Sequence, residues 1–461
     1  MKASEGQSTA GSPKNSARID YLDGIRGLAA LAVIFVHVFE AFGLDQEWAG
    51  IISNGRLTAT GIDRFIPILN NLTRYGAYAV QIFLVISGYS LMLAIAKSKD
   101  GKPKGGLKGY FVRRIRRIWP PYYAALFIGL FLIAVVPGMN VKQNIWWDQA
   151  LPAFKPDVIL SHMLFLHHFS PDWLQKINPA MWTIAIEETI YLLFPFTLLP
   201  VWRRFGTIPM VLTGIIVGAA SWYLFHPLLQ VANPWFLGLF ALGAMGASFG
   251  FSNRSQEHRW RERIPWIPVS IVSFLLFIGS DVASKQVFVS RLGFDIKGSA
   301  PWLVDAFLGI AVVALLIHLT EQWKTKEEKG LLRILHLPPI LKLGTFSYSL
   351  YLIHPPILTL VTLTAIRLNL TSWPVYVFEV VVGVPVCIIG AYLFHLVFER
   401  PFMPTYLAKA EPEVLTTTKV ASHGWMGHEQ KSEPAKIDQG VAMATPMSTS
   451  VPVNSDNIGQ D

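Results

Sequence analysis

Residues 22–43, LDGIRGLAALAVIFVHVFEAFG, form an apolar stretch long enough to cross a bilayer as a helix. The stretch contains one arginine, Arg26, and one histidine, His37, eleven residues further along. At about 100° and 1.5 Å per residue, this spacing places both side chains on one helix face, about 16 Å apart. Ionisable groups are costly in hydrocarbon, so such a pair normally faces a polar cavity. The alternative is that Arg26 snorkels to the headgroups and His37 is a hydrogen-bonded interior histidine.

The composition places the whole chain in the membrane class. Of its 461 residues, 52% are hydrophobic and 15% are charged. The net charge of +9 comes from basic residues in short segments between long apolar runs, which is the pattern of membrane loops rather than of a nucleic-acid surface. We therefore expect no nucleic-acid partner. The single cysteine, Cys387, excludes disulfides within the chain and cysteine metal clusters.

The apolar runs predict an all-α integral membrane protein with about ten transmembrane helices. They lie at approximately 24–44, 76–96, 118–137, 181–202, 207–226, 231–250, 265–281, 301–319, 343–365 and 374–397. Most Lys and Arg residues between these runs fall in alternate loops, chiefly 97–117, 251–264 and 321–342. By the positive-inside rule these loops are cytoplasmic, and an even number of helices then places both termini in the cytoplasm.

Three regions follow from this reading. We expect residues 1–21 to be a disordered cytoplasmic N-terminus followed by an uncleaved signal anchor, residues 22–402 to be a ten-helix transmembrane domain, and residues 403–461 to be a disordered cytoplasmic tail. The topology exposes the sequons at Asn71 and Asn369 outside the cytoplasm, which predicts a glycoprotein. The expected location is the endoplasmic reticulum or another endomembrane, or else the plasma membrane.

The fourth apolar run carries two adjacent carboxylates, Glu187 and Glu188. Adjacent helical residues point about 100° apart, so only one is expected to face a cavity. Counted from the predicted outer helix ends, Glu187 and His37 fall at similar depth, which predicts a hydrogen-bonded pair in which the carboxylate orients the imidazole. The alternative is a buried pair that only fastens two helices together, although such burial is a poor source of stability.

A cluster of arginines precedes the third apolar run, in GYFVRRIRRIWPPYY at residues 109–123. Helical spacing would present several guanidiniums together, and the planar guanidinium fork binds phosphate bidentately. The alternative is that arginines flanking a spanning helix only fix its topology and attract anionic lipid. The cluster consists of Arg113, Arg114, Arg116 and Arg117.

Polar side chains within other apolar runs are expected to line a cavity. They are Ser87 in the second run and Ser347, Tyr348, Tyr351 and His354 in the ninth, where the spacings of three and four form one stripe. The predicted outer loop 138–180 contains several aromatic residues and is expected to lie at the membrane interface or to cover a cavity. Its histidines, His162, His167 and His168, lack the spacing of a zinc site, and an exposed interfacial role is expected.

Taken together and in order, these motifs resemble the membrane-bound acyltransferase 3 family. The matching segments are LDGIRGLAAL (22–31), FLVISGYSL (83–91), RRIRRIWPPYY (113–123), MWTIAIEETIYLLFP (181–195), SYSLYLIHPPI (347–357) and FERP (398–401). The resemblance implies acyl transfer from acyl-coenzyme A to a hydroxyl or amine, with His37 as the catalytic histidine, Arg26 as its motif partner and the arginine cluster near the donor. The long polar tail suggests a fungal member.

The layout suits this chemistry. We expect the arginines and Arg26 to hold acyl-coenzyme A, a co-substrate rather than a resident cofactor, and His37, oriented by Glu187, to act as general base on a hydroxyl of a lipid, sugar or secondary metabolite. No metal is required, and a covalent acyl intermediate on Ser87 or Ser347 is left open. The alternative function is a secondary transporter of a small hydrophobic compound, although inverted repeats are not evident.

Overall fold

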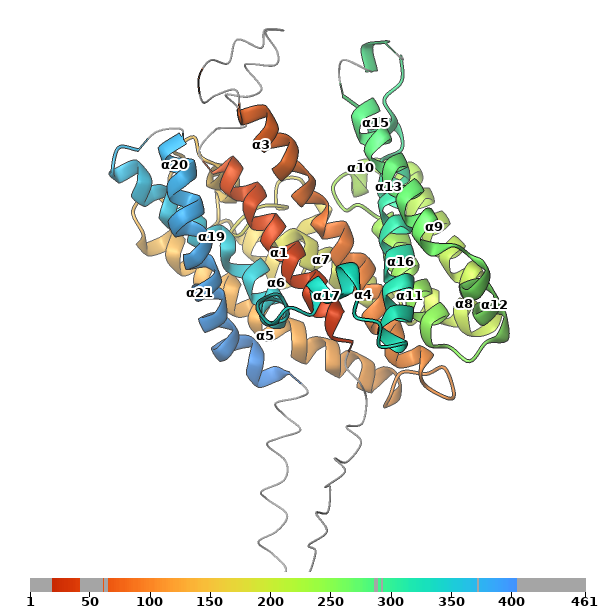
Figure 1. Ribbon diagram of the computed structural model, residues 1–461. Coiled ribbons are helices and arrows are strands. Elements are labelled where there is room, and N and C mark those ends of the chain that lie inside the picture. The colour runs from red at the N-terminus through yellow and green to blue at the C-terminus, as the bar shows by residue number, and fades with distance from the viewer. Residues whose placement is uncertain are drawn as a thin grey trace, which may run out of the picture. The chain divides into compact units, whose positions relative to one another are not determined.

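A computed structural model describes residues 19–41, 61, 65–285, 289–291, 293–370 and 373–403. Every regular element among these residues is a helix, which confirms the all-α prediction (Figure 1). The predicted disordered segments 1–21 and 403–461 lie almost wholly outside the described residues. The first helix begins at Asp20, two residues earlier than the expected boundary.

The helices of the first half of the chain are α1 (Asp20–Glu40), α3 (Ile66–Thr73), η2 (Arg74–Tyr78), α4 (Ala79–Ala96), α5 (Gly106–Val135), η3 (Trp146–Ala150), α6 (Pro156–Met163), η4 (His167–Phe169), α7 (Met181–Leu193), α8 (Leu198–Phe205), α9 (Thr207–Leu224) and α10 (His226–Leu229). The second half contains α11 (Phe236–Phe251), α12 (Ser255–Arg263), α13 (Trp266–Ala283), α15 (Ile296–Ser299), α16 (Pro301–Lys324), α17 (Gly330–Leu335), α18 (Pro338–Thr345), α19 (Ser347–Arg367), α20 (Trp373–Phe378), η5 (Glu379–Gly383), α21 (Val384–Phe394), η6 (His395–Glu399) and η7 (Arg400–Phe402).

All ten predicted spans correspond to helices in the described part of the chain. Eight helices are long and apolar enough to cross a membrane, and the number reaches ten if each of two bent pairs is one span. The bent pairs are α7 with α8, at 44°, and α11 with α12, at 99°. The protein is therefore an integral multi-pass membrane protein.

The third span differs from the prediction because it begins within the basic loop. Helix α5 runs for 30 residues from Gly106, so the arginines occupy its third and fourth turns rather than a separate short helix. Pro120 and Pro121 lie inside the helix without ending it. Neighbouring helices and polar side chains can accommodate proline in a membrane helix.

Helices α4 and α11 approach each other closely through glycines. A Cβ at Gly243 would meet the carbonyl oxygen of Val85, and a Cβ at Gly88 would meet that of Phe240. Small residues allow helix backbones to approach in this way, so that van der Waals contacts hold the helices together in lipid. The contact holds the α4 face that carries Gly88 against α11 and leaves Ser87, one residue away, free to face elsewhere.

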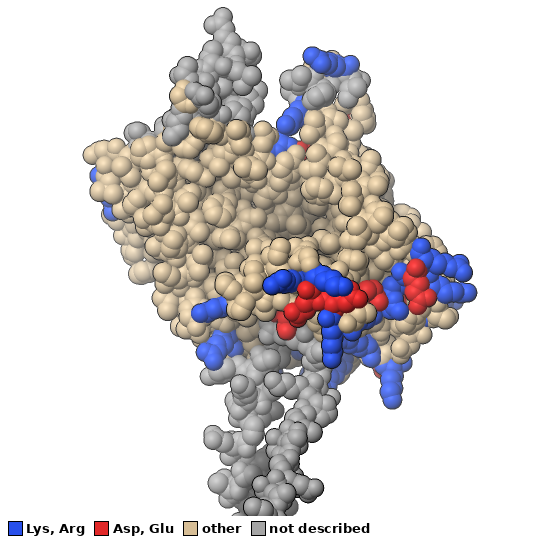
Figure 2. Space-filling model, viewed as in Figure 1, with Lys and Arg blue, Asp and Glu red and all other residues tan. Residues whose placement is uncertain are grey.

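Charged side chains mark one end of the helical bundle. Helix α1 begins at this end, and α12 brings Arg259 and Arg263 to it. On the face shown in Figure 2, most of the charged side chains lie at the same end. We call it the basic end, and the end at which α1 finishes the far end.

The segment 138–180 is folded into the bundle and does not simply cover it. Trp147 is 1% exposed, and its indole donates to the carbonyl of Met139 at 3.1 Å. Asn178 is fully buried and donates to the carbonyl of Leu352 in α19 at 2.8 Å. The interfacial position expected for this loop is therefore wrong for these residues, although Phe154 does lie exposed. Hydrogen bonds to buried backbone carbonyls compensate for the burial of the loop.

The glycine contact gives a test of the packing. We expect Gly243→Ala to destabilise the protein by about 1–3 kcal/mol, because a methyl group overpacks the contact with Val85. The matched control is Gly279→Ala in α13, where a Cβ would meet nothing within 4 Å. Thermal unfolding of both variants in detergent measures the difference, and equal melting temperatures would contradict the close approach.

Candidate functional site

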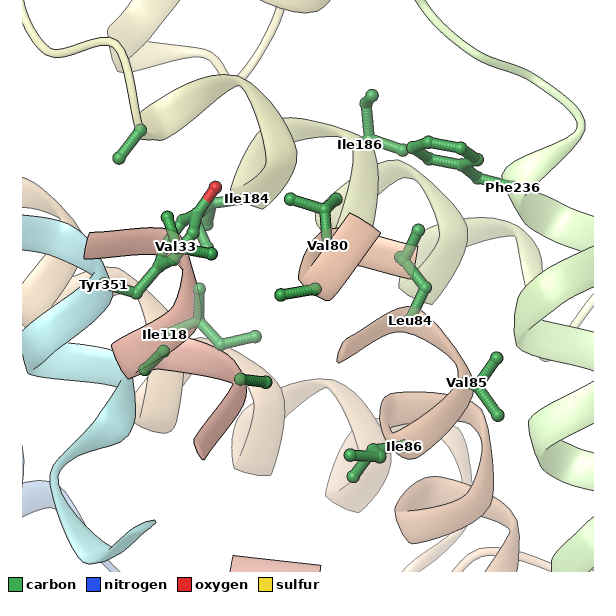
Figure 3. Packing of buried hydrophobic residues seen from close by; sticks show 14 of the residues in the cluster. Val33, Val80, Leu84, Val85, Ile86, Ile118, Ile184, Ile186, Phe236 and Tyr351 are labelled. Atoms are coloured by element: carbon green, nitrogen blue, oxygen red, sulfur yellow. The ribbon is translucent and has the colours of Figure 1, made fainter. Parts of the chain in front are cut away.

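A cavity of about 370 Å³ opens between α1, α4, α5, α7 and α19 towards the basic end. Its apolar walls include Leu22 of α1, Val80 and Leu84 of α4, Ile118 of α5 and Ile184 of α7. Figure 3 shows the last four of these among the buried hydrophobic residues packed between the helices. Its polar lining consists of Asp23, Arg26, Ser87, Ser90, Arg114, Arg117, Thr183, Glu187, Tyr191, Thr345, Ser347, Tyr348, Tyr351 and Glu399. A mostly apolar cavity with a few convergent polar groups is the usual form of a small-molecule site.

Arg26 reaches into this cavity and is held by two neighbours. One guanidinium nitrogen donates to the Asp23 carboxylate at 3.0 Å, and another donates to the Ser90 hydroxyl at 2.5 Å. The first contact is an ion pair within one turn of α1, and the second joins α1 to α4. The structure thus places Arg26 at a cavity and not at the headgroups.

The four arginines of α5 divide into two pairs. Arg114 and Arg117 line the cavity, whereas Arg113 and Arg116 do not line it and are exposed. Arg114 lies over the ring of Tyr191, 5.4 Å from its centroid. No carboxylate in the described ranges lies in ion-pairing distance of either inward guanidinium. Two cations are therefore available to an anionic ligand, since residues three apart share a helix face.

Glu187 lines the cavity, and Glu188 does not. The Glu187 carboxylate accepts hydrogen bonds from the Ser87 hydroxyl and, at 2.5 Å, from the Tyr191 hydroxyl. The Ser87 contact joins α4 to α7 at the cavity wall, and the Tyr191 contact lies within α7. The predicted pair of Glu187 with His37 is not present, because the carboxylate is bonded to these two hydroxyls instead.

His37 lies outside the cavity and has other neighbours. Its Nδ1 donates to the Glu40 carboxylate at 3.0 Å. Its ring lies 4.3 Å from that of Trp146 and stacks on that of His354 at 5.2 Å, between centroids. The His37 side chain is 21% exposed. Three elements thus converge on the imidazole: α1, η3 and α19.

The Glu187–His37 pair was predicted from helix ends that differ from those in the structure. Helix α1 finishes at Glu40, so His37 is three residues from its far end, not seven. Helix α7 begins at Met181, three residues after Asn178, which donates to the carbonyl of Leu352 inside α19 and far from the Arg367 end of that helix. Depth counted from the ends of the apolar runs therefore gave His37 and Glu187 the same value. In the structure, His37 lies near the end of α1, whereas Glu187 lies on a helix that begins inside the bundle.

The stripe on α19 divides between the two places. Tyr348 and Tyr351 line the cavity together with Ser347, whereas His354 does not. The Tyr351 hydroxyl accepts from Thr183 at 2.7 Å, and its ring lies 5.8 Å from that of His354. Tyr351 is therefore a wall between the cavity and the stacked histidines.

Several residues of the site were not assigned from the sequence. Glu40 was visible as a carboxylate three residues after His37, a spacing at which helical side chains meet. Glu399 also lines the cavity, where it accepts from Ser349 at 2.6 Å and from His395 at 2.8 Å. Trp146 lies more than a hundred residues from His37, and no local pattern could reveal that contact.

The histidines of the segment 138–180 are buried, contrary to the exposed role expected for them. His162 and His167 are 0% exposed, and their rings stack in parallel at 4.0 Å. Burial lowers the pKa of His162 to about 4 and that of His168 to about 4. Burial, assisted by the neighbouring His162, holds the pKa of His167 well below its ordinary value. Within the described residues, no group of three or more His, Cys, Asp or Glu side chains is placed to hold a metal ion.

The acyltransferase domain that defines the acyltransferase 3 family matches residues 19–397. This range includes the arginines, the His37 neighbourhood and all of the cavity lining except Glu399 and Met403. The chain belongs to the acyltransferase 3 family. The resemblance predicted from the motifs is confirmed at this level, and the family membership favours an acyltransferase over the transporter alternative.

Curated relatives of the chain are O-acetyltransferases of bacteria. The chain is 26% identical to the peptidoglycan O-acetyltransferase OatA of Listeria monocytogenes over 360 residues, which are 74% of this chain and 49% of the relative. It is 25% identical to the O-acetyltransferase OatA of Staphylococcus aureus over 386 residues, 78% of this chain and 53% of the relative. The chain thus spans about half the length of these relatives. They give the predicted fungal origin no support, and no solved structure matches the chain.

The buried histidines of this family member predict acid sensitivity. Their pKa values are lowered in the folded state, so the unfolded chain binds protons first as the pH falls below about 6.5. The stability that these neutral histidines contribute is therefore complete above pH 6.5 and is lost as the pH falls towards about 4. Melting temperatures in detergent between pH 7.5 and 4.5 measure this slope.

Replacing two of these histidines tests their part in that slope. We expect His162→Gln with His168→Gln to flatten the pH dependence, whereas His226→Gln, at an exposed histidine, keeps the wild-type slope. An unchanged slope in the double variant would show that other groups cause the acid sensitivity.

Proposed function

We propose that this protein is a membrane O-acyltransferase that moves an acetyl or other short acyl group from acyl-coenzyme A to a hydroxyl. One observation supports this most strongly. The cavity gathers three guanidiniums at its basic end, and its wall at Tyr351 contacts His354, which stacks on His37. An anion-binding mouth and a histidine thus lie along one path through the bundle.

The donor is assigned to the cavity. Coenzyme A carries several phosphates, and guanidiniums bind phosphate through paired, charge-assisted hydrogen bonds. Arg114 and Arg117 have no described carboxylate partner and are suited to this role, with Arg26 deeper in the cavity. Arg113 and Arg116 lie on the outside of the same helix, where they add positive potential that attracts the donor.

The acyl group is then carried along α1. Arg26 and His37 are eleven residues apart, so the pantetheine arm has to cover about 16 Å from the arginines to the imidazole. Tyr351 stands on this path, and its displacement would open the cavity towards His37. Nothing in this arrangement requires a covalent intermediate on Ser87 or Ser347.

His37 acts as the general base in this proposal. Its Nε2 accepts the proton of the acceptor hydroxyl while the hydroxyl oxygen attacks the thioester carbonyl. An ester C–O bond forms, the C–S bond breaks, and the proton passes to the departing thiolate, which leaves as the thiol. Glu187 remains at the donor end, where its hydrogen bonds to Ser87 and Tyr191 shape the cavity.

The acceptor class and sidedness are part of the proposal. The names of the relatives favour a sugar hydroxyl over the lipid and secondary-metabolite acceptors that the sequence also allows. The basic end is assigned to the cytoplasm, with both termini, because acyl-coenzyme A is cytosolic and basic loops stay inside. The far end, with His37, then faces the acceptor. Two predictions from the sequence stay predictions: location in an endomembrane or the plasma membrane, and glycosylation at Asn71 and Asn369.

The two arginine pairs provide a matched test of the donor site. We expect Arg114→Ala with Arg117→Ala to weaken coenzyme A binding by about 100-fold, since a hydrogen bond to a charged group contributes roughly 1.5–3 kcal/mol. Arg113→Ala with Arg116→Ala removes the same charge from the exposed face and is expected to have a much smaller effect. Calorimetry on the purified protein measures both, and unchanged binding after replacing all four arginines would remove the donor assignment.

The role of His37 is tested by activity. Membranes containing the protein are incubated with radiolabelled acetyl-coenzyme A and candidate sugar, lipid and metabolite acceptors. We expect His37→Ala to reduce transfer by about 10²–10⁴-fold, the usual contribution of a general base. His336→Ala, at a histidine of the basic end, is the control. A stably expressed His37→Ala protein that transfers as well as wild type would refute this mechanism.

A further inference from the structure

We propose that Glu40 is the positioning carboxylate of His37 and that Glu187 does not have this role. The inference rests on the proposed function, since it assigns a partner to the histidine of that reaction. It concerns a residue near the far end of α1 for which neither the motifs nor the relatives give any role. The carboxylate and the imidazole form a pair on one helical turn.

The contact itself is specific. His37 Nδ1 and a Glu40 carboxylate oxygen are 3.0 Å apart, at a spacing of three residues on α1. The side chains are 21% and 32% exposed, so the pair is open on one side rather than buried as a structural tie. An exposed pair at this spacing contributes only a few tenths of a kcal/mol to stability. Stability is therefore a weak reason for the contact, and orientation of the imidazole is the role that we infer for it.

The hydrogen bond determines which nitrogen can act as a base. A carboxylate can only accept, so Nδ1 carries the proton in the neutral ring and Nε2 presents its lone pair. In the described part of the chain, only Nδ1 of His37 has a hydrogen-bond partner. Nε2 is thus available to an acceptor hydroxyl. When it takes the proton, the negative carboxylate stabilises the resulting imidazolium.

Other carboxylates of the site are already committed elsewhere. Glu187 is bonded to Ser87 and Tyr191, and Glu399 is bonded to Ser349 and His395. Both carboxylates belong to other helices, α7 and η6, and neither is hydrogen-bonded to His37. Glu40 is the carboxylate that reaches this imidazole among the residues that the structure describes.

The aromatic rings beside His37 also support a positioning role for Glu40. His354 cannot replace the carboxylate, because its Nδ1 faces the backbone carbonyls of Leu350 and Tyr351. Its ring stacks on His37, and Trp146 contacts the same imidazole. These ring contacts restrict rotation of the imidazole about its Cβ–Cγ bond but leave it free to adopt either of two orientations related by a 180° flip. The bond to Glu40 removes that freedom and fixes the direction of Nε2.

Kinetics of Glu40 variants test this role. We expect Glu40→Gln to lower kcat by about 10–100-fold with little change in the KM for the donor, since the donor site is at the other end of α1. Glu40→Asp is expected to restore part of the loss, because it keeps a carboxylate on the same turn. The control is Glu328→Gln, which removes a carboxylate bonded to His336 Nδ1 at 3.3 Å, away from the cavity. This control is expected to keep wild-type kcat.

A double-variant cycle separates positioning from a general structural effect. If Glu40 acts through His37, then Glu40→Gln causes no further loss in a His37→Ala background. Equal additional losses in both backgrounds would overturn the inference, as would wild-type kcat in Glu40→Gln while His37→Ala is inactive. Activity retained by His37→Ala would instead overturn the proposed function itself. Melting temperatures of all variants in detergent show whether each protein is folded.

Discussion

A guanidinium placed among membrane helices must be compensated, and the hydrogen bonds of Arg26 to Asp23 and Ser90 meet that requirement. They hold α1 against α4 at the basic end of the bundle. Helix α4 is in turn held against α11 by glycine contacts at Gly88 and Gly243. The position of the cavity follows from this: one face of α4 is occupied by α11, and another carries Ser87 and Ser90 to the space beside Arg26.

The same helix carries the two chemical tasks of the proposed reaction at different depths. The cations that suit a phosphorylated donor gather where α1 begins, and His37 lies where it ends, with Tyr351 and His354 between them. Such separation suits a reaction whose two substrates arrive from opposite sides of a membrane. It also explains why the two ends use different carboxylates, Glu187 beside Ser87 and Glu40 beside His37.

The spans were predictable because hydrocarbon permits few structures and every apolar run had to become a helix. The inward position of Arg26 was also predictable, since a charge on an apolar helix needs a partner. The Glu187–His37 pair was wrong because depth was counted from helix ends that a single apolar run does not define. The burial of Trp147 and Asn178 was missed for a related reason, since hydropathy cannot distinguish a loop over a bundle from one packed into it.

The contacts of His37 with Glu40 and Trp146 show which contacts a sequence can reveal and which it cannot. The Glu40 contact follows from a spacing of three on one helix and could have been read from the sequence. The Trp146 contact depends on how a long segment folds back onto α1, which no local pattern encodes. Similarly, the four arginines were correctly seen as a cluster, but only packing determines that Arg114 and Arg117 face the cavity.

In the proposed mechanism, an acyl donor anchored at the basic end delivers its acyl group to His37. An experimental structure with a non-hydrolysable acetyl-coenzyme A analogue tests it most directly. We expect phosphates against Arg114 and Arg117, Tyr351 displaced, and the acyl carbonyl carbon close enough to His37 Nε2 for a hydroxyl to fit between them. An analogue bound with its acyl group away from α1, or outside the cavity altogether, would contradict this mechanism.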